Sequence, residues 1–331
     1  AKIGLSYVSV DGARANAQAE TAALDFDQTR AQARATWEEG LGSIDATGGT
    51  DRDRITFYTS LYHSLLHPNT FQDVDGRYTG YDGTIHSVEE GRDFYVNFSG
   101  WDTYRGQSQL VALLYPERAS DINQSIVDMV SQSGKWTSWP TYNQIQTKMS
   151  GDSLQNIVAA TDDFGSTDYD RAKALESMLA TQTLPMTNTG RSDAVMYGIH
   201  GWIDGDKQGA ATSRTIEYTT NDFAIAQMAK RLGNEAAYEQ FSTRSQNWKN
   251  IFNTATGHID ARNRNGFLNT SLTTQGAQFE QSTGYQYGFN VSHNMADLID
   301  LRGGKDEATE QLDRILRDLD AGAFSDAAYI A

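Results

Sequence analysis

Apolar residues recur every three or four positions along most of this chain, which is the spacing of amphipathic helices. Ile55, Tyr58, Tyr62 and Leu65 lie on one such stripe, and Pro68 ends it. The pattern predicts helices over residues 13–41, 51–67, 101–115, 117–132, 152–163, 168–181, 212–232, 235–254, 284–301 and 305–319.

Two segments depart from this helical pattern. Apolar and polar residues alternate over residues 2–10, which include β-branched side chains, and this predicts a short strand. Residues 68–97 carry Asp/Gly turn chemistry, which predicts a loop. No heptad persists and no repeat is found, so the chain is predicted to be mostly α, built from antiparallel helix pairs. Periodicity alone leaves a bundle, a solenoid and a toroid of helical hairpins open.

Composition narrows the possible partners. The 331 residues include 27 basic and 43 acidic ones, a net charge of −16, whereas nucleic-acid binders need a basic footprint. No run of about 18 apolar residues occurs, so no membrane-spanning helix is predicted. The absence of cysteine excludes disulfides, thiolate metal sites and a cysteine nucleophile. We therefore expect neither nucleic acid nor membrane as a partner.

The two ends predict an internal piece of a larger protein. The first residues lack the apolar core of about 7 to 15 residues that a signal peptide needs. The last residues, through Tyr329 and Ile330, stop with neither a cap nor a polar tail.

An aromatic and charged motif lies at the mouth of a predicted helix. Trp101 and Asp102 could bind one sugar, because an indole covers the apolar side of a pyranose while a carboxylate accepts from its hydroxyls; Arg105 follows within the same motif. The alternative is a helix cap beside a core tryptophan. Trp136 lies in a second aromatic and polar segment, which is typical either of a sugar cleft or of a packed hinge.

Other candidates for chemistry are weaker. Asp204 and Asp206 resemble a metal loop only faintly, and His63 and His67 lack the glutamate of the zinc-protease pattern. Glu217 and Asp222 are five residues apart on a predicted helix and hence on different faces, which argues against an acid and base formed by these two alone.

Residues 279–287 carry the most informative motif, Phe-Glu-Gln-Ser-Thr-Gly-Tyr-Gln-Tyr. It resembles the Phe-x-Glu-Gly-x-x-x-Gln-Tyr signature of glycoside hydrolase family 92, the calcium-dependent, inverting exo-α-mannosidases. Gln281 stands where that signature has its catalytic glutamate. Further landmarks of the family follow in the same order along the chain, at residues 62–69, 75–78, 101–105, 116–119, 149–152, 214–218 and 225–230.

The resemblance implies an architecture, a metal and a location. The family joins an N-terminal β-sandwich to an (α/α)6 toroid, so residues 1–12 would end the sandwich or form a linker, and residues 13–331 would form the first part of the toroid. The calcium ligands and the aspartate bases would lie beyond Ala331, and none of the metal ligands within this chain. The protein would be secreted, bacterial and active on glycans that contain mannose.

The resemblance also implies roles for individual residues. Asp102 would bind mannose hydroxyls, Gln281 would occupy the general-acid position, and substrate contacts would include Trp101, Arg105, Trp136 and Tyr285.

A glutamine cannot donate a proton as a carboxylic acid does, and this departure predicts the substrate. A phosphate leaves as a stable anion that gains little from protonation, whereas an alkoxide needs an acid. The leading hypothesis is an inverting hydrolase of mannosyl phosphodiesters such as mannose-α-1-phospho-6-mannose, or another mannosyl-phosphate glycan. The alternatives are a conventional α-mannosidase, of the α-1,2 type, with Glu280 as its acid, and a silent mannose-binding module.

Overall fold

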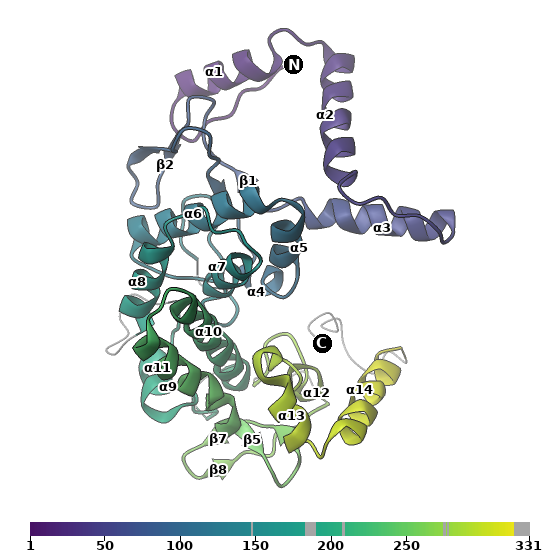
Figure 1. Ribbon diagram of the computed structural model, residues 1–331, viewed down its shortest axis with the longest axis vertical. Coiled ribbons are helices and arrows are strands. Elements are labelled where there is room, and N and C mark those ends of the chain that lie inside the picture. Colours follow the sequence, from purple (N-terminus) through teal and green to yellow (C-terminus); the bar gives the residue numbers. More distant parts are fainter. Residues whose placement is uncertain (147, 183–189, 207–208, 274–275, 277, 321–331) are drawn as a thin grey trace. The chain divides into compact units, whose positions relative to one another are not determined.

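A computed structural model describes the chain except residues 147, 183–189, 207–208, 274–275, 277 and 321–331 (Figure 1). The predicted apolar end at Tyr329 and Ile330 lies outside the described residues. The chain divides into two compact units, each described by itself below. The first unit comprises Ala1–Gly134, Trp139–Gln146 and Ala160–Arg171, and the second Lys135–Ser138, Thr147–Ala159 and Ala172–Ala331.

The first unit opens on helices whose first turns are capped by side chains. α1 (Val10–Thr21) begins at Ser9, whose hydroxyl accepts from the N–H of Gly12. α2 (Phe26–Leu41) and α3 (Asp51–Ser64) begin with capping boxes at Asp25 and Thr50. The strand predicted at residues 2–10 is wrong: residues 2–9 form no strand and Val10 is helical. Ser6 turns this segment instead, since its hydroxyl accepts from the N–H groups of Val8 and Ser9.

Four short strands interrupt the predicted loop at residues 68–97, most of which lies outside regular structure. β1 (Asn69–Thr70) pairs with β4 (Tyr95–Val96), and β2 (Arg77–Thr79) pairs with β3 (Ile85–Ser87), both antiparallel. They bury a cluster formed by Phe71, Tyr78, Phe94 and Val96.

Three helices follow in this unit. The predicted helix at 101–115 is two, α4 (Gly100–Thr103) and α5 (Gln107–Leu114). α6 (Pro116–Ser133) buries one face and ends at Gly134, whose left-handed backbone suits glycine.

The second unit is organised around α10 (Ala211–Arg231), most of whose side chains are buried. α11 (Glu235–Ser245) packs beside it, as Figure 1 shows. α8 (Arg171–Gln182) and α9 (Ala194–His200) precede α10, and α7 (Leu154–Asp163) has its first residues in this unit. The pattern did not predict α9.

Hairpins and shorter helices complete the second unit. β5 (Phe252–Asn253) pairs with β6 (His258–Ile259), and β7 (Arg262–Asn263) pairs with β8 (Gly266–Phe267). The predicted helix at 284–301 breaks into α12 (Gly284–Tyr287), a 3₁₀ turn (Ser292–Asn294) and α13 (Met295–Leu301), and α14 (Lys305–Asp320) follows.

Candidate active site

The segment around Gln281 has a constrained backbone. Gln281 has a backbone φ of 47°, in the left-handed region that residues other than glycine rarely adopt. Its amide Nε2 lies 3.5 Å from the sulfur of Met149, which is also left-handed, with φ of 59°. Both side chains are half-buried. Strained backbone of this kind clusters at active sites, so the meeting of these two residues marks a candidate site.

Glu280 is held separately from its neighbour. Its backbone N–H donates to the hydroxyl of Ser213 at 2.8 Å, at the start of α10. Its carboxylate lies 3.5 Å from the hydroxyl of Ser150. The adjacent side chains of Glu280 and Gln281 thus contact different residues of the 149–150 segment.

α12 fixes the end of the signature segment. Thr283 and Gln286 form a capping box at its start. At its end, the hydroxyl of Tyr287 donates to Glu217 on α10, and the amide of Asn290 donates to the same carboxylate oxygen at 3.0 Å. Glu217 is fully buried. Its role could not be predicted from the sequence, because only the fold brings residues 217, 287 and 290 together.

Tyr285 projects from the same short helix into other contacts. Its ring meets His258 edge-on at 5.3 Å and lies 5.4 Å from the Arg314 guanidinium. Burial and the charges of Arg302 and Arg314 lower the pKa of His258, so its imidazole stays neutral over a wider pH range. The predicted contact of Tyr285 with substrate stays a prediction.

A buried charge network occupies the other side of α10. Asp222 accepts from Arg191 at 2.9 Å, from Arg244 at 3.0 Å and from the hydroxyl of Tyr197 at 2.7 Å. Arg191 also lies 3.3 Å from Asp152. The side chains of Arg191, Asp152 and Asp222 are fully buried. Burial raises the pKa of Tyr197 well above its ordinary value, so its hydroxyl remains a donor.

This network agrees with the sequence interpretation of α10. Glu217 and Asp222 serve different partners, as their spacing predicted, and do not form an acid and base pair. No motif pointed to Arg191 or Arg244.

Trp136 is a core residue of the second unit. It has 0% exposure, and its indole N–H donates to Ser177 on α8 at 3.2 Å. The predicted contact of Trp136 with sugar stays a prediction.

In the first unit, Trp101 lies inside α4 with 1% of its surface exposed. Asp102 is half-buried, and its carboxylate accepts from the hydroxyl of Ser99. The Arg105 guanidinium lies 5.2 Å from the Trp101 ring centroid and 4.6 Å from that of Tyr104, within cation–π range. These residues form one packed cluster, and their predicted roles in binding sugar stay predictions.

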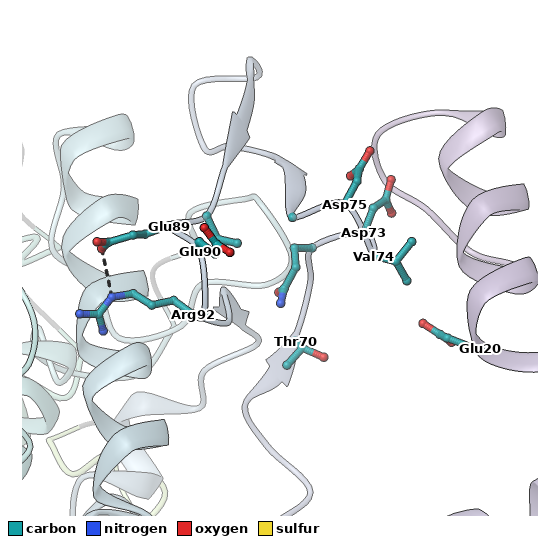
Figure 2. A pocket seen from close by; sticks show the side chains of 12 residues that line it. Glu20, Thr70, Asp73, Val74, Asp75, Glu89, Glu90 and Arg92 are labelled. Carbon is teal, nitrogen blue, oxygen red and sulfur yellow. Dashed lines mark hydrogen bonds and ion pairs between the residues drawn. The ribbon is translucent and has the colours of Figure 1, made fainter.

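A pocket of about 530 Å³ in the first unit is lined by twelve residues, of which five carry a carboxylate and one, Arg92, is basic (Figure 2). Asp73 is tied to Ser6 at 2.7 Å and to Asn16 at 2.8 Å, and Glu89 pairs with Arg92 at 3.2 Å. The Arg77 side chain lowers the pKa of Asp75, which therefore stays ionised. An acidic lining repels anions, so this pocket is a poor place for a phosphate.

The calcium implied by the resemblance has no ligand set in the part of the chain that the structure describes. Among those residues, no three His, Asp or Glu side chains gather to hold a metal ion. Asp204 instead accepts from the N–H of Asp206, as in a turn, and Lys207 lies outside the described residues.

Comparison with known proteins identifies the family. Residues 12–329 match the glycosyl hydrolase family 92 catalytic domain. The fold and the signature segment are those of a carbohydrate-cleaving catalytic domain, and the chain belongs to glycosyl hydrolase family 92. The predicted fold class is confirmed: a mostly helical chain with the fold of the family's toroidal catalytic domain.

Several individual proteins resemble the chain. A family GH92 alpha-mannosidase from Bacteroides thetaiotaomicron is 30% identical, with a TM-score of 0.85 over 94% of this chain. A family GH92 inverting mannosidase from the same species is 28% identical, also at 0.85 over 94% of the chain. An uncharacterized secreted glycosidase from Arthroderma benhamiae is 28% identical over 95% of the chain.

The chain spans less than half of each relative. It covers 41% of the first mannosidase, 43% of the second and 41% of the Arthroderma protein. The helices that the structure describes include none long and apolar enough to cross a membrane.

Proposed function

We propose that the full-length protein carrying this chain is an inverting glycoside hydrolase that removes α-mannose from mannosyl phosphodiesters such as mannose-α-1-phospho-6-mannose. The observation that carries the proposal is Gln281 at the position of the family's catalytic glutamate. Mannosidase chemistry is supported by the relatives, which are an alpha-mannosidase and an inverting mannosidase, and by the complex of the first with mannoimidazole. The secreted Arthroderma relative supports an extracellular location.

In the proposed reaction, water attacks the anomeric carbon from the face opposite the phosphate. The bond from that carbon to the phosphate oxygen breaks, and its electron pair leaves with the phosphate as a phosphomonoester. A carboxylate base elsewhere in the full-length protein takes the proton from water. Calcium, when bound there as the family resemblance implies, would orient the sugar and polarise its hydroxyls.

The leaving group decides whether an acid is needed. An alkoxide has a conjugate acid with a pKa near 15.7, as for water, so general acid help is worth about 10²- to 10⁴-fold. A phosphomonoester has a second pKa of about 6 and leaves as a stable anion. The neutral amide of Gln281 can donate a hydrogen bond to this anion, whereas a glutamate would repel it.

The local geometry supports Gln281 over Glu280 for this task. Gln281 has the strained backbone typical of active sites, whereas Glu280 is held through both its N–H and its carboxylate by serines. Glu280 still offers a half-buried carboxyl next to Gln281, which keeps a conventional α-mannosidase as the second candidate.

The test compares kcat/KM for a mannosyl phosphodiester and for α-1,2-dimannoside in the full-length protein and two variants. We expect the parent to prefer the phosphodiester strongly. Gln281→Glu should lower phosphodiester cleavage about 10-fold or more, because it places a carboxylate beside the phosphate. Glu280→Gln should change it less than about threefold.

Two results would contradict the proposal. A parent that prefers the dimannoside and loses this activity on Glu280→Gln would make Glu280 the acid. A parent that binds mannose but cleaves neither substrate would be a silent binding module.

A further inference from the structure

The signature segment is fastened to α10 on both sides of Gln281. Before Gln281, the N–H of Glu280 donates to Ser213 at 2.8 Å. After it, Tyr287 and Asn290 both donate to one carboxylate oxygen of Glu217. Ser213 and Glu217 are four residues apart and hence neighbours on one face of this helix.

The segment that carries Met149 packs on the same carboxylate-bearing residue. A Cβ added at Gly151 would lie 3.0 Å from the Cβ of Glu217 and 2.9 Å from the amide oxygen of Asn221. The N–H of Asp152 donates to that same oxygen at 2.8 Å. The backbone at Gly151 therefore lies directly against α10.

We propose that Glu217 is a positioning residue, which holds the signature segment and the Met149 segment on α10 and thereby sets where the Gln281 side chain lies. It is not a catalytic residue, since it is fully buried. The inference rests on the proposed function in one respect, the role of Gln281 toward the leaving phosphate.

The physical argument combines strain with anchoring. Left-handed backbone is unfavourable at residues such as Met149 and Gln281, and it persists only where the surroundings hold it. Glu217 restrains the signature segment strongly, because hydrogen bonds to a carboxylate are shorter and stronger than those between neutral groups. The Glu217 carboxylate bonds the signature segment, and the Cβ of the same residue lies beside Gly151, so one residue of α10 contacts both segments.

The first experiment measures anchoring without activity, by amide hydrogen exchange of the full-length protein. Tyr287→Phe removes the hydroxyl that donates to Glu217 and keeps the ring. Tyr197→Phe is the matched control, because Tyr197 donates from elsewhere to the other buried carboxylate of α10, Asp222. We expect exchange over residues 279–290 to quicken at least about 10-fold in Tyr287→Phe and to stay unchanged in Tyr197→Phe.

The second experiment measures the consequence for the reaction. Tyr287→Phe should lower kcat for the phosphodiester about 10-fold with KM within about threefold, because positioning acts on the transition state. In a Gln281→Ala background the same substitution should change the residual kcat less than about twofold. Glu217→Gln, which keeps an acceptor oxygen, should retain more activity than Glu217→Ala.

The outcomes separate this inference from the proposed function. Equal exchange over residues 279–290 in Tyr287→Phe and the parent would overturn the positioning role, as would an equal loss of kcat with and without Gln281. A protein that cleaves no phosphodiester while Tyr287→Phe still quickens exchange would refute the proposed function and leave the anchoring by Glu217 standing.

Discussion

At the scale of single residues, the second unit buries charged side chains in its core. Asp222 is the centre of this arrangement, with Arg191, Arg244 and Tyr197 as its donors. Breaking a buried pair leaves a partner charge uncompensated, which costs about 3–5 kcal/mol. The identity of Asp222 should therefore matter far more for stability than that of a carboxylate on the surface.

We expect Asp222→Asn to lower the free energy of unfolding by about 3 kcal/mol or more. Glu38→Gln is the control, because Glu38 pairs with Arg34 on an exposed helix face, where water screens ion pairs and they contribute little to stability. Urea denaturation of both variants measures the difference. Equal losses in the two would show that Asp222 is not the centre of the network.

At the scale of elements, hydrophobic spacing predicted the long helices and missed the short elements. α6 and α10 were predicted within one or two residues, because their many buried positions repeat with the helical period. Strands of two or three residues, such as β1 and β2, have no room for a periodic pattern. The alternation at residues 2–10 suggested a strand, but a strand needs a partner, and Ser6 and Ser9 turn and cap the chain there.

The candidate site was also predictable only in part, because a sequence pattern shows only residues that are close together along the chain. Gln281 could be found because its neighbours in sequence form a motif. Glu217 and Arg191 could not, since their partners lie tens of residues away in the sequence and come together only through tertiary packing.

Gly151 offers a test at this scale. Gly151 has φ of 88° and no room for a Cβ, whereas Gly134, with φ of 71°, has no atom within 4 Å of where its Cβ would be. Gly134→Ala should cost about 1–2 kcal/mol, the strain of a left-handed residue. Gly151→Ala should cost about 1–3 kcal/mol more, because the added methyl overpacks against α10.

Thermal and urea unfolding of the two glycine variants supply the comparison. A Gly151→Ala protein no less stable than Gly134→Ala would mean that the segment at 149–151 does not lie against α10.

At the scale of the whole molecule, the chain covers less than half of the proteins it resembles. The proposed reaction needs a base and, by resemblance to family 92, calcium, and the described residues hold no metal ligand set. This chain contains the folded core and the signature segment. Complete turnover is expected to need the remainder of the family's domain.

We therefore expect the 331-residue chain by itself to show no turnover of mannosyl phosphodiesters or aryl α-mannosides, and the full-length protein to be active and inhibited by a calcium chelator. Both proteins are assayed side by side, with and without chelator, and calcium is then added back. Turnover by the 331-residue chain that a chelator leaves unchanged would place the base and the essential groups within it.

The meeting of Met149 and Gln281 in left-handed backbone has a consequence for how this protein could be improved or could evolve. Asparagine and glycine adopt that conformation at lower cost, so a search for heat-resistant variants should recover them at positions 149 and 281. Those variants would gain lifetime at high temperature while losing the thioether and the longer amide that meet there. Thermostability and turnover should therefore trade against each other at these two positions.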